Sequence, residues 1–147
     1  MLLFAGFVCV LVFVRGLWSV PKTLTAAPAD QFELIEPGQT VLLRQGAKNI
    51  WVTRFNQPLQ AFYRTNRAML LATPSACGPD SRLCIIDAQT SRAGVLLRHV
   101  VTRPQQLGPD QPWMSGLVDP ATGAVYDLFG RCYQTSGCQQ GLAGESM

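Results

Sequence analysis

The chain has 147 residues, which fits one domain with an ordinary core once any membrane anchor is set aside. Charged residues make up 14% of it, and the net charge of +3 is spread thinly along the chain. Proteins that bind nucleic acids carry basic residues in clusters with interleaved aromatic residues, so this composition argues against a nucleic-acid partner.

The first element is an apolar segment. Residues 2–20 carry no charge apart from Arg15, and Pro21 ends the run. A spanning helix needs about 17–25 mainly apolar residues, so we expect residues 2–20 to form an uncleaved transmembrane anchor that contacts membrane lipid. A secretory signal peptide is the alternative, but the basic start and the A-x-A cleavage site are missing. Gly6 and Gly16 would allow another helix to pack closely against the anchor.

The segment that follows changes in character twice. Residues 21–31 are mostly small and polar with two prolines, which predicts a tether. From Phe32 the chain consists of short runs broken by turns, and no window keeps a helical period. About seven runs read as strands: Thr40–Gly46, Asn49–Phe55, Gln60–Asn66, Ala68–Pro74, Leu83–Gln89, Gly94–Arg103 and Gly123–Gly130. The predicted fold is therefore an all-β small sandwich or barrel over residues 32–140, with a flexible tail at 141–147.

Four cysteines form two closely spaced pairs, Cys77 with Cys84 and Cys132 with Cys138. Each pair encloses a short turn, and no C-x-x-C spacing is present, which disfavours a zinc ribbon. Paired cysteines around tight turns are typical of disulfides formed in an oxidising compartment, and four buried thiols in a cytosolic domain are the alternative.

The orientation of the domain rests on two opposing signals. Arg15 and Lys22 follow the apolar segment, and the positive-inside rule would keep that side in the cytoplasm. The cysteine pairs argue for the opposite side. We give the cysteines more weight and expect a single-pass protein of the inner membrane with its β domain in the periplasm.

Residues for catalysis are scarce. His99 is the one histidine, and its apolar neighbours indicate a strand residue and not a ligand or a base. No G-x-S-x-G elbow and no G-K-[ST] phosphate loop occur, and the acidic residues are dispersed in turns. We therefore expect no enzymatic activity, no cofactor and no metal.

One stretch, LVDPATGAVYDLFGR at residues 117–131, resembles the second cluster-binding loop of Rieske iron-sulfur proteins, C-P-C-H-G-S-x-Y-D-x-x-G-R. The matching positions are Pro120, Gly123, Tyr126, Asp127, Gly130 and Arg131. The cluster ligands do not match: Asp119 and Ala121 stand at the two cysteine positions, Thr122 at the histidine and Ala124 at the serine.

A second stretch, LIEPGQTVLLRQGAKNIWVTR, is similar to the opening hairpin of the Rieske subunit of cytochrome bc complexes. The similar positions are Ile35, Gly38, Gln39, Val41, Gly46, Trp51, Val52 and Arg54. The order of one apolar segment, a small tether and a β domain is also that of this subunit. The resemblance therefore implies a Rieske-like scaffold over about residues 35–131.

A Rieske centre binds its two irons with two cysteines and two histidines. A chain with one histidine cannot provide this ligand set. The resemblance thus implies the scaffold without its cluster, in which Gly123, Gly130 and Tyr126 are kept for the shape and packing of the loop.

The resemblance implies an accessory, non-catalytic subunit of a larger respiratory membrane complex, and a cytochrome bc-type quinol oxidoreductase is the first candidate. The alternative is a periplasmic β-domain component of an envelope assembly or secretion machine. An enzyme or a metal carrier is the third hypothesis. Fold alone decides none of them.

The tip of this loop, residues 119–123, has few side chains that could bind a ligand, and we expect it to form a contact surface for a partner. The candidate interface residues are Trp113, Met114, Leu117, Asp119, Pro120 and Thr122, with Pro112 beside them. Tryptophan and methionine are enriched in the cores of interfaces. The alternative, slightly favoured, is that Trp113 closes one end of the β core.

Overall fold

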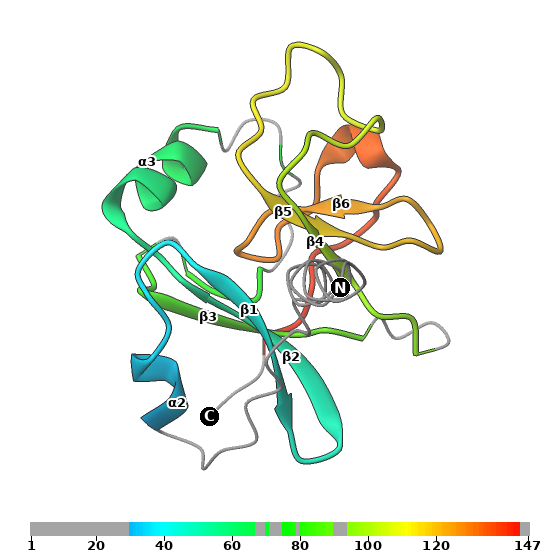
Figure 1. Ribbon diagram of the computed structural model, residues 1–147. Coiled ribbons are helices and arrows are strands. Elements are labelled where there is room, and N and C mark those ends of the chain that lie inside the picture. The colour runs from blue at the N-terminus through cyan, green and yellow to red at the C-terminus, as the bar shows by residue number, and fades with distance from the viewer. Residues whose placement is uncertain (1–29, 67–69, 71–74, 79, 90–93, 145–147) are drawn as a thin grey trace, which may run out of the picture.

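The computed structural model describes residues 30–66, 70, 75–78, 80–89 and 94–144 and shows a small β domain with two three-stranded antiparallel sheets (Figure 1). The first sheet has the order β1-β2-β3 and the second the order β4-β5-β6. In chain order the elements are α2 (Asp30–Glu33), β1 (Thr40–Gln45), β2 (Lys48–Arg54), α3 (Gln57–Thr65), β3 (Leu83–Asp87), β4 (Arg98–Val100), β5 (Gly116–Val118), β6 (Val125–Tyr126) and the 3-10 helix η2 (Gln134–Ser136).

The first sheet starts with the predicted β1–β2 hairpin. Its turn contains Gly46 at a φ of 61°, a left-handed conformation that glycine adopts without strain. Leu43 lies opposite Ile50, and Val52 lies opposite Ile85 of β3. Because side chains alternate along a strand, these four residues share one face, where they form a buried cluster.

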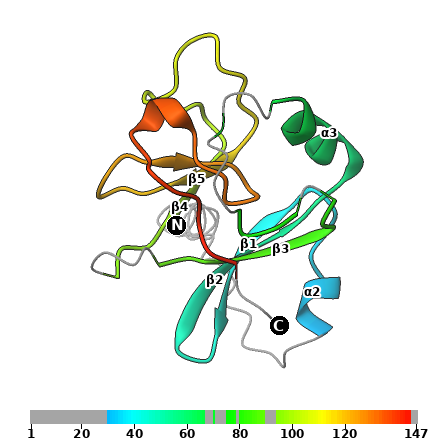
Figure 2. The ribbon, with the colours of Figure 1, turned by 180° about the vertical axis from the view of Figure 1, so that it is seen from behind.

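The second sheet is built from much shorter strands. His99 of β4 lies opposite Leu117 of β5, which lies opposite Tyr126 of β6. Two hydrogen bonds connect this part of the chain with the first sheet: the Leu97 amide donates to the Ala88 carbonyl at 2.7 Å, and Trp51 Nε1 donates to the Leu97 carbonyl at 3.0 Å. Figure 2 shows the two sheets from behind, one above the other.

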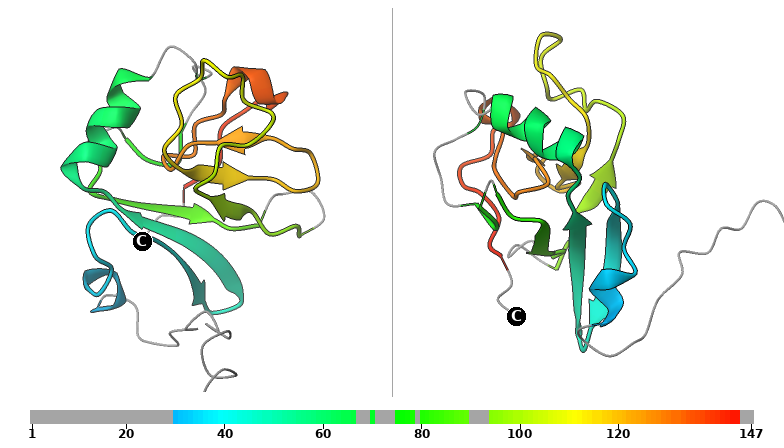
Figure 3. Two further views of the ribbon diagram at one scale, coloured as in Figure 1. Left: turned by 45° about the horizontal axis from the view of Figure 1, so that its top comes forward. Right: turned by 90° about the vertical axis from the view of Figure 1, so that its left-hand side faces the viewer.

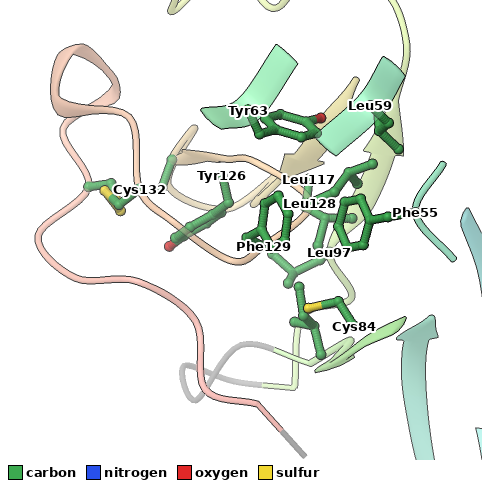
Figure 4. Close-up of a cluster of buried hydrophobic side chains, with 13 residues drawn as sticks. Phe55, Leu59, Tyr63, Cys84, Leu97, Leu117, Tyr126, Leu128, Phe129 and Cys132 are labelled. Carbon is green, nitrogen blue, oxygen red and sulfur yellow. A yellow bond between two sulfur atoms is a disulfide. The ribbon is translucent and has the colours of Figure 1, made fainter. Parts of the chain in front are cut away.

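The main core lies where both sheets meet α3 (Figure 4). Cys84 and Ile86 come from the first sheet, Leu117 and Tyr126 from the second, and Tyr63 from α3. In the same cluster the rings of Phe55 and Phe129 stack with centroids 4.2 Å apart, and the Tyr63 ring meets both of them edge to face. The core therefore joins segments that are far apart in the sequence.

One predicted strand, Gln60–Asn66, is wrong, because Gln60–Thr65 belongs to the helix α3 and Asn66 is its C-cap. Asn56 caps this helix by accepting a hydrogen bond from the Leu59 amide at 3.0 Å, and Pro58 lies in its first turn. Leu59 and Tyr63 are buried at helical spacing. The sequence pattern favours a strand here because nine helical residues are too few to show a clear helical period.

The other strand predictions have mixed outcomes. β1, β2 and β3 confirm three of them, and β4 and β6 are shorter than the predicted runs. β5 was not predicted. Within Ala68–Pro74 only Leu70 is described, and it forms an isolated bridge with Tyr133.

Residues on both sides of the expected domain boundaries make contacts with the β domain. α2 includes Asp30 and the buried Gln31, which were assigned to the tether. At the other end the Leu142 amide donates to the Gly130 carbonyl at 2.8 Å, and Gly144 forms a bridge with Ile86. Leu142 and Gly144, which lie within the predicted tail at 141–147, thus make backbone contacts with the β domain.

The predicted anchor, residues 2–20 with Gly6 and Gly16, lies outside the described residues. Among the residues that are described, no helix is long and apolar enough to cross a membrane.

Candidate functional site

The β5–β6 loop, whose sequence resembles a cluster-binding loop, is closed by its own aspartate. The Ala121 amide donates to Oδ1 of Asp119 at 2.8 Å, and the Thr122 hydroxyl donates to Oδ2 at 2.9 Å. The main chain adds two bonds, since the Gly123 amide donates to the Asp119 carbonyl and the Asp119 amide donates to the Ala124 carbonyl. A short acidic side chain that accepts bonds from the next residues is a standard way to hold a turn.

Two of the residues that were predicted to contact a partner, Leu117 and Asp119, are buried. Leu117 has an exposed fraction of 0% and Asp119 of 4%, so neither side chain is available to a partner. Leu117 belongs to the main core, whereas Asp119 faces inward to bind its own loop. Pro120 and Thr122 are exposed, as a contact surface requires.

The D-L-F-G-R sequence after β6 forms a buried turn that fixes the loop to the rest of the domain. Oδ1 of Asp127 accepts from the amides of Phe129 and Arg131 at 3.0 and 2.8 Å. Its Oδ2 accepts from Nε of Arg131 at 2.6 Å. Gly130 has a φ of 79°, which closes the turn in a conformation that favours glycine.

Burial dominates the electrostatics of this turn. Asp127 is fully buried, and the loss of hydration raises the pKa of its carboxyl to about 6, although Arg131 acts in the opposite direction. Burial also raises the pKa of the Tyr126 hydroxyl, and the Asp119 carboxylate contributes to this rise. These shifts follow from packing, so they do not by themselves indicate an active site.

Figure 3 shows α3 beside the loops of the second sheet. Two hydrogen bonds attach the helix to these loops. Nη2 of Arg131 donates to the Tyr63 carbonyl at 3.0 Å, and the Tyr63 hydroxyl donates to the Ser115 carbonyl at 2.5 Å. The guanidinium of Arg131 also lies 5.2 Å from the centre of the Phe129 ring. Arg131 and Asp127 of the Y-D-x-x-G-R pattern thus make contacts that stabilise this part of the domain.

Trp113 covers one end of the second sheet. Its ring lies 5.8 Å from that of Tyr133 and packs against a small cluster of Leu70, Leu107 and Val125. Its Nε1 donates to the Val101 carbonyl at 2.9 Å. Trp113 and Pro112 are half-buried, whereas the Met114 side chain is 40% exposed. Of the apolar residues before the tip, Met114 is thus the one most open to a partner.

His99 lies between the two sheets and not at the tip. Its ring is 5.8 Å from that of Trp51, and its Nε2 is buried without a hydrogen-bond partner. Burial lowers the pKa of this imidazole, which keeps it neutral near pH 7. A neutral strand histidine at this place agrees with the expectation from the sequence.

Both cysteine pairs are disulfides. Cys77 is bonded to Cys84, and Cys132 is bonded to Cys138. The second disulfide follows the D-L-F-G-R turn directly. Within the part of the chain that is described, no three histidine, cysteine or acidic side chains come together as metal ligands would.

Two features were missed at the level of sequence. The first is the ion pair of Asp127 and Arg131. The two residues match the family motif, and their i, i+4 spacing could have indicated that their side chains are in contact. The exposed Val101, at 68%, was placed inside a predicted strand and had no signal in the sequence.

Comparisons with known proteins identify no family. No family model matches the chain. A curated protein with a similar segment is the membrane alanyl aminopeptidase of Manduca sexta, which is 32% identical over 98 residues. This segment covers 55% of the chain, and the chain spans 10% of the length of that relative.

Proposed function

We propose that this chain is a non-catalytic, cluster-free accessory subunit of a larger respiratory membrane complex, anchored by residues 2–20. A cytochrome bc-type quinol oxidoreductase is the first candidate host. The finer fold assignment, a Rieske-like sandwich or barrel, belongs to the same proposal.

The observation that carries the proposal is the hydrogen-bond network of Asp119. In the resembling family this loop would be held by a metal cluster through its cysteines and its histidine. In this chain Asp119 holds the loop through Ala121 and Thr122, at the positions that match the lost ligands. A loop that is rigid without metal is what a domain with a purely structural role requires.

The residues that do match the family support this view. Tyr126 packs in the core, Asp127 and Arg131 form the buried turn, and Gly123 and Gly130 have positive φ values of 75° and 79°. Each has a structural reason to be present in a protein without a cluster. These roles support a scaffold that folds without an iron-sulfur cluster.

The disulfides support the periplasmic location. Mass spectrometry of the unreduced protein tests this point. We expect no free thiol at Cys77, Cys84, Cys132 or Cys138. Four free thiols would remove the argument for an oxidising compartment, and with it the proposed orientation.

An aminopeptidase activity is not proposed. The similar segment corresponds to 10% of the Manduca sexta protein, too little to transfer its activity. A zinc site of the H-E-x-x-H type needs two histidines, and this chain has one.

Iron analysis and paramagnetic resonance of the purified, dithionite-reduced protein test the cluster-free assignment. We expect no iron in stoichiometric amount and no rhombic low-temperature signal, because the second imidazole ligand does not exist. A signal stoichiometric with the chain would refute the assignment.

Purification of the full chain from its native membranes in mild detergent tests the host complex. We expect cytochrome subunits to co-purify. Secretin, pilus or lipoprotein subunits in their place would favour the envelope assembly alternative. A detergent wash at high salt serves as a control for loosely adsorbed proteins, because exposed charge contacts are screened by salt.

A further inference from the structure

β1, drawn in cyan in Figure 1, is an outer strand of the first sheet, because among the described residues it pairs with β2 alone. The direction of its main-chain groups follows from β2. The Asn49 carbonyl of β2 accepts from the Ala88 amide just after β3, so the main-chain groups of Asn49 face β3. Asn49 pairs with Arg44 of β1, and this pair is therefore a non-hydrogen-bonded one. Because the direction alternates along a strand, the N–H and C=O groups of Arg44, Leu42 and Thr40 point away from β2.

The side chains of β1 leave apolar surface on both faces of this sheet edge. Val41 is half-buried and packs beside the cluster that contains Leu43 and Ile50. Leu42 is half-buried on the opposite face, where it lies across from Trp51. A strand added along this edge would cover both side chains and would pair the outward main-chain groups, which is how exposed sheet edges bind further strands.

The sequence of β1 is self-complementary about Leu42. The polar residues Thr40 and Arg44 stand two positions to either side of it, and the apolar residues Val41 and Leu43 stand one position to either side. A two-fold interface brings the same surface of both copies together, so it requires this kind of symmetry. When two β1 strands run antiparallel with Leu42 opposite Leu42, Val41 meets Leu43 of the other copy, and Arg44 meets Thr40.

We infer that β1 pairs with β1 of a second copy of this chain, antiparallel and centred on Leu42, so that the first sheets of the two copies form one continuous sheet. The inference goes beyond the proposed function and does not depend on the identity of the host complex.

Charge fixes the register of this pairing. Arg44 is the one charged residue of β1. In the register centred on Leu42, it stands opposite the Thr40 hydroxyl of the second copy. A register that placed Arg44 opposite Arg44 would set like charges directly against each other, which is destabilising. The register centred on Leu42 avoids this repulsion and matches apolar residues on both faces of the edge.

Cysteine crosslinking of the full chain in mild detergent, with copper phenanthroline as the oxidant, tests the pairing. All variants carry Cys9→Ser, because Cys9 is the one cysteine outside the two disulfides. In the proposed register the Cα atoms of the two Leu42 residues lie about 5.5 Å apart, within the range of a disulfide. We therefore expect Leu42→Cys to give a covalent dimer.

Arg44→Cys is the matched control from the same strand. The two Arg44 residues would be offset by about 13 Å along the strands, which no disulfide spans. We expect it to give at least about fivefold less covalent dimer than Leu42→Cys. A mixture of Thr40→Cys and Arg44→Cys copies, each with its own tag, should restore the crosslink, because these positions face each other. No crosslink from Leu42→Cys, or an equal yield from Arg44→Cys alone, would overturn the inference.

Light scattering of the purified full chain is the second readout. Leu42→Lys places like charges opposite each other at the centre of the pairing, and we expect it to raise the Kd of the dimer at least about tenfold. Gln45→Lys adds the same charge at an exposed position of β1 away from the centre and should leave the dimer intact. Circular dichroism checks that both variants are folded. A monomeric wild type, an unchanged dimer of Leu42→Lys, or a Leu42→Cys crosslink that forms only with other proteins would refute the pairing.

Discussion

The carboxylate of Asp127 lies 2.6 Å from Nε of Arg131, and the same guanidinium reaches the Tyr63 carbonyl of α3 at 3.0 Å. Asp127 is completely buried, and the Arg131 side chain is 13% exposed. The pair thus connects the turn after β6 with a helix 68 residues earlier in the chain. We therefore expect the stability of the loop region to depend on this connection.

Removing Arg131 should be severely destabilising. Arg131→Ala leaves the Asp127 carboxylate buried without its counter-ion, which costs about 3–5 kcal/mol in the free energy of unfolding. The matched control is Arg64→Ala, because Arg64 pairs with Asp80 on the surface, where an ion pair contributes about 0–1 kcal/mol. Chemical denaturation of both variants measures the difference. Equal losses would mean that the buried pair has no special weight.

The pH dependence of stability should carry the signature of Asp127. Burial raises the pKa of its carboxyl from 3.8 to about 6 in the folded state. Between these values the folded chain holds a proton that the unfolded chain has released, so the free energy of unfolding falls as the pH rises. Denaturation midpoints measured from pH 4 to pH 7 should show this slope in the wild type and lose it in Asp127→Asn. A variant with the wild-type slope would contradict the assignment.

His99 should give a slope of the opposite sign. Burial lowers the pKa of its imidazole below the ordinary 6.5, so below this pH the unfolded chain binds a proton more readily than the folded one. The contribution of His99 to stability is therefore present above pH 6.5 and is lost as the pH falls through the folded pKa. His99→Phe fills the space beside Trp51 without a titrating group. We expect the stability difference between wild type and His99→Phe to grow in favour of the variant on acidification.

Because Asp119 accepts two hydrogen bonds with its side chain, its substitutions should lower the free energy of unfolding by different amounts. Asp119→Ala removes the acceptor of both the Ala121 amide and the Thr122 hydroxyl and should cost about 2–3 kcal/mol in the free energy of unfolding. Asp119→Asn keeps one carbonyl oxygen as an acceptor and should cost less. Pro120→Ala, at an exposed position of the same loop, is the control and should change stability by no more than about 0.5 kcal/mol. Hydrogen exchange of the Ala121 and Gly123 amides would report the same ranking.

Trp113 is expected to behave as a core residue. Trp113→Ala uncovers Tyr133 and the backbone at Gly116, where an added Cβ would collide with the indole ring, and should cost about 3 kcal/mol in the free energy of unfolding. Met114→Ala, at the exposed neighbour, should leave the melting temperature nearly unchanged. If Trp113→Ala melts normally but abolishes assembly with the host complex, Trp113 is an interface residue. Normal melting and normal assembly would assign it neither role.

Much of the first sheet is determined by the sequence itself. The β1–β2 hairpin and β3 are runs of five to seven residues with β-branched side chains, and Gly46 marks the turn between the first two. Each run carries enough local preference to be recognised alone. The pairing of the cysteines could also be predicted from the sequence, because each disulfide joins two cysteines that are close in the chain.

Tertiary structure decided the second sheet, α3 and the burial of Asp119 in the β5–β6 loop. β5 and β6 have three and two residues, too few for a pattern, and they exist because they pair with each other and bury Leu117 and Tyr126 in the shared core. α3 is fixed by its Asn56 cap and by the burial of Tyr63. Asp119 looked like an exposed contact residue in the sequence, since aspartate in a turn is usually solvated. Whether its carboxylate meets solvent or its own loop depends on how β5 and β6 bring the loop ends together, and that is a property of the folded chain.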